Sequence, residues 1–358
     1  MTITDSRQII AENGSSFIDN AGEGGVYILG TNKYGASIKG WFESKSIPVH
    51  GFINDFTKDA SFEALPVVRS GEVPAGQYLV NCVLEGRAVE GYDMLRGLSP
   101  KQVTDYFSLQ LAFPEALAEV DFMANTASIL AEQELYHDLY EQLGDKESKD
   151  TLVQLLNFRL NRDVNSLRNF QFRIHEQYFE PFIALPENAT FIDGGGFDGA
   201  TSLYFASLYP KYRSIYFFEP NEMIIPTAKE KLKELPNLHF YEKGLWSSTT
   251  TLQFDNTLSS ASKLSLEGNI SIPTVSIDEI VTDKVDFIKL DIEGAEYEAI
   301  IGAKETIVTY KPILAVCVYH AQKDYLRIPS LIQQYRNDYK IYLRHYTQGV
   351  FETVMYFI

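Results

Sequence analysis

The sequence is short of cysteine. Cys82 and Cys317 are the only two cysteines among 358 residues, and both lie in apolar stretches typical of strands. So few thiols exclude a disulfide framework or a metal site built from thiolates. We expect both to be small core residues of a protein in a reducing compartment.

Long apolar runs and a basic charge excess are also missing. No run approaches the ~18–20 apolar residues that span a bilayer, and residues 1–14 lack the basic stretch and apolar core of a secretory signal. We therefore expect a cytoplasmic protein with no membrane span. The 48 acidic residues exceed the 31 basic ones, giving a formal net charge of −17 that repels nucleic acid unless a local basic patch overrides it.

The composition that is present fits a folded chain of two units. Hydrophobic residues make up 45% and charged residues 22%, close to the globular average. The length exceeds one domain of about 100–200 residues. We predict a leader at residues 1–24, a small Rossmann-like domain at 25–110, a helical connector at 111–185 and a second α/β domain at 186–358.

Residues 25–110 begin like a Rossmann-like unit. An apolar strand at 26–30 leads into a turn bounded by Gly30 and Gly35, then a helical pattern, then a second strand ending at Asp55. Further strands are predicted at 66–68 and 78–83. Strand signals vanish from 99 to 182, where helical spacing predicts a packed connector with an exposed break at 144–148.

The second half predicts a mostly parallel sheet. Short apolar runs that suit strands buried on both faces lie at 190–193, 214–218, 238–241, 285–290 and 313–318. Two more runs, 339–343 and 353–357, are joined by a polar turn without a helix and predict an antiparallel hairpin at the sheet edge. The Ser- and Thr-rich stretch between 247 and 277 predicts an inserted β-ribbon or lid.

A glycine-rich turn follows the first of these strands. Gly194, Gly196 and Gly199 match the dinucleotide pattern G-x-G-x-x-G. Asp193 and Asp198 oppose a dinucleotide, because carboxylates repel a pyrophosphate that binds to bare amides. S-adenosylmethionine carries an ammonium and a sulfonium instead of phosphates, so acids beside the turn favour it.

Glu219 supplies a second constraint. It ends the second strand of this half, about 20 residues beyond the turn, where an acid can accept hydrogen bonds from both ribose hydroxyls. Alternatively, Asp193 caps a helix and Glu219 is only a solvated strand end. The two acids in this order favour adenosine binding.

Three stretches resemble the signatures of the FkbM family of S-adenosylmethionine-dependent methyltransferases: residues 193–199, 218–221 and 288–296. The resemblance covers about residues 170–358. It implies a class I methyltransferase fold, a seven-stranded and mostly parallel sheet with a terminal antiparallel hairpin. Family members commonly carry Asp-x-Gly-Ala-Asn-x-Gly at the turn, where this chain departs with Gly196, Phe197 and Asp198.

The resemblance also implies which residues bind the donor. Gly244, Leu245 and Trp246 follow the third strand, where such folds cover the adenine, and Arg173 and Tyr178 precede the fold, where a helix could close over the donor carboxylate. The expected donor-binding residues are Asp193, Gly194, Gly195, Gly196, Gly199, Glu219, Pro220, Asn221, Gly244, Leu245, Trp246 and Tyr178.

Methyl transfer to a hydroxyl also requires removal of a proton. Open α/β sheets bind ligands beyond the carboxyl ends of their strands, where this chain has Asp291, Glu293, Tyr319 and His320. We predict that His320 is the base, because an unperturbed imidazole pKa near 6.5 suits proton removal at neutral pH.

The other catalytic candidates are Asp291, Glu293 and Lys289. Asp291 is expected to face the donor or the acceptor, and Glu293 and Lys289 to orient a ligand or pair with each other. Asp291, Glu293 and His320 could also collect a hard divalent cation, as in some sugar methyltransferases, but no spacing rule requires one and no metal is predicted. His345 is interpreted as structural.

Residues 27–35 and 49–55 resemble the amino-terminal nucleotide-sugar domain of bacterial sugar acyltransferases (PglD-like). The resemblance implies that a nucleotide-linked sugar or glycan precursor docks through Gly30, Asn32 and Asp55. A degenerate domain kept for dimerisation or positioning is the alternative. FkbM-type enzymes of polysaccharide gene sets commonly methylate sugar hydroxyls, so we predict a cytoplasmic O-methyltransferase of polysaccharide biosynthesis, with a homodimer as one expected state.

Two other functions remain open. An NAD-dependent oxidoreductase or epimerase would use both glycine turns, and a thermal shift with NAD but not with S-adenosylhomocysteine would indicate it. A non-catalytic two-domain binding protein would bind the donor without turnover of any acceptor.

Overall fold

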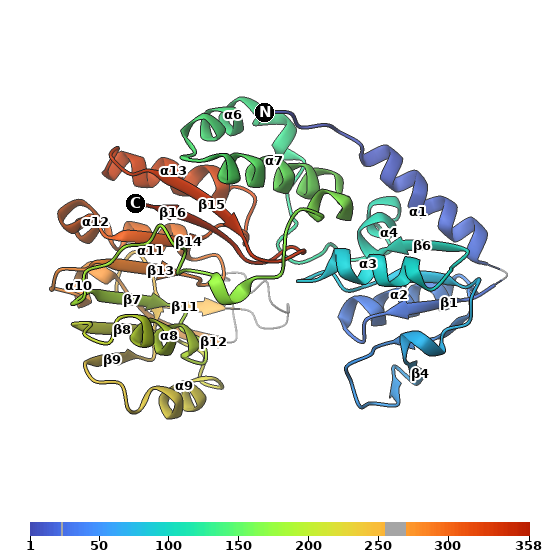
Figure 1. The fold of residues 1–358 in the computed structure, drawn as a ribbon, viewed down its shortest axis with the longest axis horizontal. Helices are drawn as coiled ribbons and strands as arrows, with labels where there is room; N and C mark the ends of the chain where they lie inside the picture. Colours follow the sequence, from blue (N-terminus) through green and yellow to red (C-terminus); the bar gives the residue numbers. More distant parts are fainter. Residues whose placement is uncertain (23, 255–269) are drawn as a thin grey trace. The chain divides into compact units, whose positions relative to one another are not determined.

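The computed structural model describes residues 1–22, 24–254 and 270–358. The chain divides into two compact units (Figure 1). The first contains residues 1–133, 150–174 and 345–351, and the second contains residues 134–149, 175–344 and 352–358. Each unit is built around its own sheet, so each positions its candidate residues independently.

The first unit contains a six-stranded sheet in the order β3-β4-β2-β1-β5-β6. The five strands from β4 to β6 in this order run parallel, and β3 pairs antiparallel with β4. This is the Rossmann-like arrangement predicted for residues 25–110. The strands are β1 (Val26–Leu29), β2 (Val49–Ile53), β3 (Ser61–Phe62), β4 (Leu65–Val68), β5 (Tyr78–Asn81) and β6 (Gln102–Asp105).

Helices and short 3-10 turns complete the first unit. The Asn32 side chain caps the second helix by accepting hydrogen bonds from the amides of Tyr34 and Gly35. The helices are α1 (Arg7–Ala21), α2 (Lys33–Ser44), α3 (Ala88–Gly97), α4 (Tyr106–Ala112), α5 (Ser128–Ala131) and most of α7 (Lys146–Asn161), with 3-10 turns η1 (Ser70–Glu72), η2 (Val164–Leu167) and η3 (Ile174–Glu176), the last at the unit boundary.

The second unit contains the predicted seven-stranded sheet, in the order β15-β16-β14-β13-β7-β8-β9. The five strands from β14 to β9 run parallel, and β16 is antiparallel to β14. Every residue of β7, β8 and β13 is buried, as expected for strands covered on both faces. The strands are β7 (Thr190–Gly194), β8 (Ser214–Phe218), β9 (Leu238–Tyr241), β13 (Phe287–Leu290), β14 (Ile313–Cys317), β15 (Ile341–His345) and β16 (Thr353–Phe357).

The predicted ribbon is a separate three-stranded sheet, in which β11 (Thr250–Phe254) pairs antiparallel with β12 (Ile270–Val275) and β10 (Gly244–Leu245) pairs parallel with β12. The rest of the predicted ribbon, residues 255–269, lies outside the described residues. The helices of the second unit are α6 (Gln133–Gln142), α8 (Ala200–Leu208), α9 (Ile225–Leu232), α10 (Ile277–Ile280), α11 (Glu296–Ile301), α12 (Lys304–Tyr310) and α13 (Asp324–Tyr335).

Two elements differ from the sequence prediction. Strand β6 lies within residues 99–182, where the sequence pattern predicts no strand. It pairs parallel with β5 and forms the edge of the first sheet. The predicted leader contains helix α1, which buries Gly14, Phe17 and Ala21. A Cβ on Gly14 would lie 2.5 Å from the carbonyl oxygen of Ser108, so α1 packs closely on α4 at this point.

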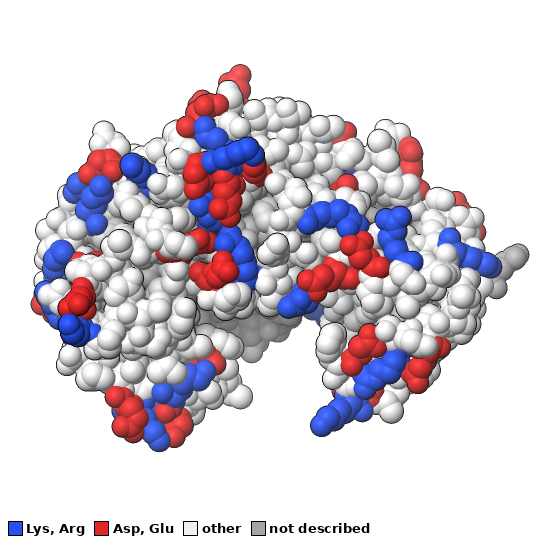
Figure 2. Space-filling view, viewed as in Figure 1, with Lys and Arg blue, Asp and Glu red and all other residues white. Residues whose placement is uncertain are grey.

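The surface carries both signs of charge. On the face shown in Figure 2, acidic and basic side chains alternate, and neither sign forms a continuous stripe. Among the described residues, no helix is both long enough and apolar enough to cross a membrane.

Candidate active site at the carboxyl edge of the second sheet

The strand order places the predicted motifs at one edge of the sheet. Strands β7 and β13 are neighbours at its centre, and the connections after them lead to opposite sides of the sheet order. Ligands of open α/β sheets bind at such a switch point, beyond the carboxyl ends of the strands. The glycine turn follows β7, Glu219 follows β8, Asp291 follows β13 and His320 lies beyond β14.

The glycine turn is held tightly against this edge. The amides of Gly195 and Gly196 each donate a hydrogen bond of 3.0 Å to the carbonyl oxygen of Phe218. Gly195 has φ +71°, and a Cβ there would lie 1.8 Å from the carbonyl oxygen of Asp291. A larger residue at Gly195 would therefore push the β7 turn away from the β13 turn.

Asp193 and Lys289 form a buried ion pair beneath the turn. Lys289 Nζ lies 3.0 Å from Asp193 Oδ1, and the two side chains are 3% and 0% exposed. Lys289 Nζ also donates to the carbonyl oxygen of Gly195 at 2.5 Å, and Ser202 Oγ donates to Asp193 Oδ2 at 2.7 Å. Burial works to lower the pKa of Lys289, but the carboxylates of Asp193 and Asp291 outweigh it and raise that pKa.

This pair corrects two predictions. Lys289 is paired with Asp193 rather than with Glu293, so of the two alternatives for Lys289 and Glu293, the one in which they pair with each other is wrong. Asp193 does not offer an uncompensated charge to a cationic ligand, because its carboxylate is neutralised by Lys289 within the protein. Both residues support the turn from below. Asp198 is likewise engaged, since it pairs with Lys231 and its Oδ1 accepts a hydrogen bond of 3.0 Å from the Ala200 amide at the start of α8.

Glu219 reaches the glycine turn from the end of β8. Its Oε2 accepts a hydrogen bond of 2.9 Å from the Phe197 amide, and its Oε1 accepts one of 2.8 Å from the Asn221 amide. Burial raises the pKa of Glu219, and these two amide hydrogen bonds oppose the shift. Each carboxylate oxygen still has a second lone pair, so the side chain can also accept from a diol.

Four of the other predicted donor residues lie close together, and Trp246 contacts the three-stranded sheet. A Cβ on Gly194 would lie 2.7 Å from Leu245, and one on Gly244 would lie 4.0 Å from Pro220, so these four residues are near one another at the edge. Trp246 is half-buried, and its amide donates a hydrogen bond of 2.9 Å to Val275 on β12.

Arg173 lies in the first unit, where its guanidinium is 4.9 Å from the ring centre of Tyr346. Its predicted position over the donor carboxylate therefore remains untested.

Asp291 lies directly after β13, where two tyrosines reach its carboxylate. Its Oδ2 accepts a hydrogen bond of 2.8 Å from Tyr178, and its Oδ1 accepts one of 3.2 Å from Tyr319. Burial works to raise the pKa of Asp291, but the positive charges of Lys289 and His320 and these hydrogen bonds lower it below the usual range. The carboxylate is therefore ionised at neutral pH.

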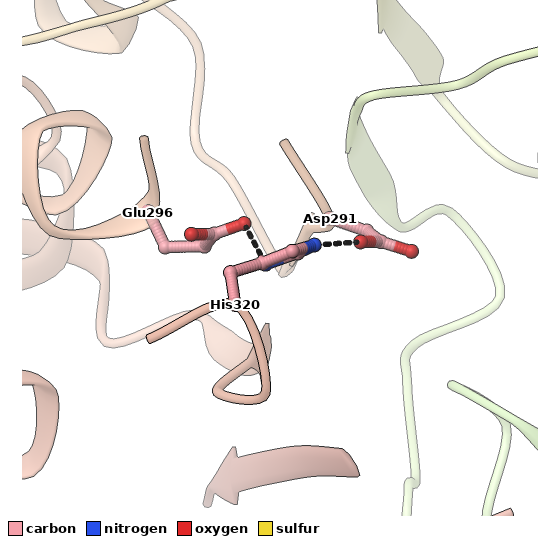
Figure 3. Close-up of side chains that lie close together, drawn as sticks. All are labelled: Asp291, Glu296 and His320. Carbon is pink, nitrogen blue, oxygen red and sulfur yellow. Dashed lines mark ion pairs between the residues drawn. The ribbon is translucent and has the colours of Figure 1, made fainter. Parts of the chain in front are cut away.

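His320 is surrounded by acids. Its Nδ1 lies 3.1 Å from Glu296 Oε1, and its Nε2 lies 3.6 Å from both Asp291 Oδ1 and Glu293 Oε2. Figure 3 shows Asp291 and Glu296 at opposite edges of the imidazole. Burial works to lower the pKa of His320, but Glu296 first and then Asp291 and Glu293 outweigh it and raise the pKa to about 9.

This environment corrects the predicted role of His320. With a pKa of about 9, the imidazole is protonated at neutral pH and has no lone pair to accept a proton. The prediction of His320 as the base assumed an unperturbed pKa. A histidine flanked by three carboxylates either carries a positive charge itself or binds a metal cation.

The structure adds three residues that sequence reasoning did not assign. Glu296 lies within a signature stretch, but it was not singled out because an acid in the first turn of a helix is common. Gln177 Nε2 donates to both Tyr178 Oη, at 3.0 Å, and Glu352, and so links Tyr178 to the loop before β16. Burial raises the pKa of Glu352 to about 7. No local sequence signal marks this loop.

The predicted residues of the first unit lie at the carboxyl ends of β1 and β2. Asn32 Oδ1 caps α2, and its Nδ2 donates a hydrogen bond of 2.9 Å to the carbonyl oxygen of Cys82. Asp55 is exposed, and its Oδ1 accepts 2.8 Å from the Ser70 amide. Gly30 has φ +111° at the turn. Asn32 therefore shapes this turn, and ligand binding there remains a prediction.

Comparisons with known proteins agree with this geometry. Residues 193–340 match the methyltransferase FkbM domain. The 2-O-methyltransferase NoeI of Sinorhizobium fredii (strain NBRC 101917 / NGR234) is 24% identical over an alignment of 188 residues that covers 44% of this chain and 75% of NoeI. The crystal structure of a methyltransferase FkbM from Methylobacillus flagellatus KT has a TM-score of 0.75 and 21% identity, over 99% of this chain and 98% of that one. This likeness confirms the predicted fold.

Proposed function

Because residues 193–340 form a methyltransferase FkbM domain, we propose that the chain transfers the methyl group of S-adenosylmethionine to a hydroxyl oxygen of a sugar or glycan. One observation carries the proposal. The glycine turn and Glu219 adjoin Asp291 and His320 across the neighbouring strands β8, β7, β13 and β14. A donor side and an acceptor side therefore meet at the switch point of one sheet.

The donor side has the chemistry that S-adenosylmethionine requires. Glu219 has lone pairs for the two ribose hydroxyls and is fixed by the amides of Phe197 and Asn221. A side chain at Gly195 would meet the backbone of Asp291 and one at Gly196 would meet the Phe217 ring, so these glycines let the turn lie close against the strand ends. Pro220, Gly244 and Leu245 adjoin this turn. When bound, the donor supplies a methyl group on a sulfonium, which is already activated for displacement.

The acceptor side provides alignment and a proton acceptor. Transfer forms an oxygen–carbon bond, breaks the carbon–sulfur bond and releases the hydroxyl proton. The Asp291 carboxylate receives that proton, because it is ionised at neutral pH and half-buried at the strand end. Tyr178 and Tyr319 fix its orientation. A positioned base of this kind contributes about 10²–10⁴-fold to the rate.

The choice of an oxygen acceptor is supported by the relative NoeI, which is a 2-O-methyltransferase. The choice of a sugar follows from the resemblance to FkbM-type enzymes of polysaccharide gene sets. In the same proposal, the first unit holds a nucleotide-linked precursor through Gly30, Asn32 and Asp55, at the carboxyl ends of β1 and β2. A cytoplasmic location and a homodimer belong to this proposal as well.

Transfer of an isotope-labelled methyl group tests this function. The full chain is incubated with labelled S-adenosylmethionine and a mixture of nucleotide sugars, oligosaccharides and amines, and the products are analysed by mass spectrometry. We expect label on a sugar oxygen, and at least about 100-fold slower transfer by Asp291→Asn. The Asp283→Asn variant, which changes an exposed acid before β13, should retain the wild-type rate. Label only on amines, or equal rates for both variants, would contradict the proposal.

A further inference from the structure

We propose that Asp291, Glu293 and His320 form a site for a divalent cation, and that Glu296 positions His320 within it. The three ligands come from two strand ends, because Asp291 and Glu293 follow β13 and His320 lies beyond β14. Glu296 is the first residue of α11. The cation would lie on the acceptor side of the sheet edge.

The two nitrogens of His320 face different carboxylates, which gives those carboxylates different roles. Asp291 Oδ1 and Glu293 Oε2 both lie 3.6 Å from Nε2. Glu296 Oε1 lies 3.1 Å from Nδ1, on the edge of the ring opposite Asp291 (Figure 3). The Nδ1 edge faces Glu296, so a cation that displaces the proton from Nε2 would bind the freed Nε2 lone pair, which faces the other two carboxylates. A carboxylate that orients a histidine in this way is the usual second layer of a metal site.

Glu296 is itself fixed for this role. Its side chain is fully buried, and Oε1 accepts hydrogen bonds from the amides of Ile292, at 2.8 Å, and Gly294, at 3.4 Å. Its second oxygen, Oε2, is buried and receives no hydrogen bond from any residue in the described ranges. A buried carboxylate with an unsatisfied oxygen is costly unless positive charge lies nearby. The buried Glu296 carboxylate therefore favours a proton on the His320 Nδ1 that faces it.

The spacing suits a small cation. A metal that binds carboxylate oxygen and imidazole nitrogen at about 2.1 Å keeps adjacent ligand atoms about 3 Å apart. Asp291 Oδ1 and Glu293 Oε2 each lie 3.6 Å from His320 Nε2, and closing these two separations requires a shift of roughly half an ångström. The Glu293 side chain is 68% exposed and can move, while Tyr178 and Tyr319 keep Asp291 in place.

The charge of the cluster also favours a cation. Three carboxylates surround one imidazole, so the four side chains carry a net charge of −2 even when His320 is protonated. Lys289 acts on Asp291, but it forms its ion pair with Asp193 beneath the glycine turn. A divalent ion would neutralise this excess at the strand end.

The ligands indicate which ions fit. Two carboxylates and one imidazole match Mn²⁺, and Mg²⁺ less well because of the nitrogen ligand. Such a set leaves open positions in an octahedral shell, where a hydroxyl oxygen can bind. The ion would acidify that hydroxyl and so ease transfer of its proton to the Asp291 carboxylate. This role, unlike the binding itself, rests on the proposed function.

Titration of the full chain with Mn²⁺ alone, followed by the electron paramagnetic resonance signal of the free ion, tests the site. We expect saturable binding of one ion by the wild type. Glu293→Gln and Glu296→Gln should each weaken binding at least about tenfold. The Glu293 side chain is exposed, so its replacement should leave the fold intact. The matched control is Glu234→Gln, which changes an exposed glutamate beyond α9 and should bind like the wild type.

The result separates the site from the proposed function. Absence of saturable Mn²⁺ binding, or equal affinity of wild type, Glu293→Gln and Glu296→Gln, would overturn the cation site. Calorimetric binding of S-adenosylhomocysteine by the same samples reports on the donor side independently. Donor binding without Mn²⁺ binding would refute the cation site and leave the methyltransferase proposal standing. Mn²⁺ binding without donor binding would refute the methyltransferase proposal and leave the cation site standing.

Discussion

Replacing Asp193 with alanine should destabilise the second unit rather than only weaken donor binding. The substitution leaves the Lys289 ammonium, 3% exposed, without its carboxylate partner at 3.0 Å. Removing one partner of a buried ion pair costs about 3–5 kcal/mol, because the remaining charge stays desolvated. The hydrogen bond from Ser202 to Asp193 is lost as well. We expect a loss of about 3–5 kcal/mol in the free energy of unfolding of this unit.

The double variant Asp193→Ala/Lys289→Met separates this charge effect from lost packing. Removing both charges should recover most of the loss, since apolar replacement of a buried pair is often close to neutral. Urea unfolding can be followed by Trp246 fluorescence in a Trp41→Phe background, because Trp41 and Trp246 are the two tryptophans. Trp246 belongs to the second unit, so its signal reports on that unit.

Two outcomes would refute this reasoning. Asp193→Ala could cost less than about 1 kcal/mol, which is the value for an exposed pair. Alternatively, the double variant could be no more stable than the single one, which would mean that the carboxylate contributes through contacts other than the Lys289 charge.

Three further predictions concern single side chains. Burial lowers the pKa of His345 to about 3. The unfolded chain therefore gains a proton at His345 below pH 6.5 while the folded chain does not, so the free energy of unfolding falls as the pH falls from 6.5 toward 3. His345→Gln should reduce this dependence on pH in urea unfolding between pH 7 and 4.5. Tyr178→Phe removes the 2.8 Å hydrogen bond to the Asp291 carboxylate and should cost about 1.5–3 kcal/mol by the same assay. Lys231→Met breaks the partly exposed pair with Asp198 and should change unfolding by less than about 1 kcal/mol.

Much of the fold could be predicted because its strands have strong local signals. The apolar runs at β7, β8 and β13 and the hairpin of β15 and β16 are where the pattern placed them. Strand β6 was missed, since the Gln102–Asp105 segment is short and has only one apolar residue, Val103. It becomes a strand by pairing with β5, which no local pattern shows.

The site was predicted in position but not in its charges. Asp193, Glu219, Asp291 and His320 all lie at the expected strand ends. The pairing of Asp193 with a lysine on the neighbouring strand, and the three acids around His320, depend on tertiary contacts between segments far apart in the chain. A pKa follows from such neighbours, so the base could not be chosen from residue type alone.

Binding of S-adenosylhomocysteine by Glu219 variants tests the central claim, that this strand edge binds a methyl donor. Calorimetry should show one binding site in the wild type and a loss of at least about 100-fold in affinity for Glu219→Ala, because hydrogen bonds to a charged group contribute about 1.5–3 kcal/mol each. Glu222→Gln, an exposed neighbour, should bind as the wild type does. Equal affinity of the wild type and a folded Glu219→Ala variant, or no binding to the wild type, would contradict the account.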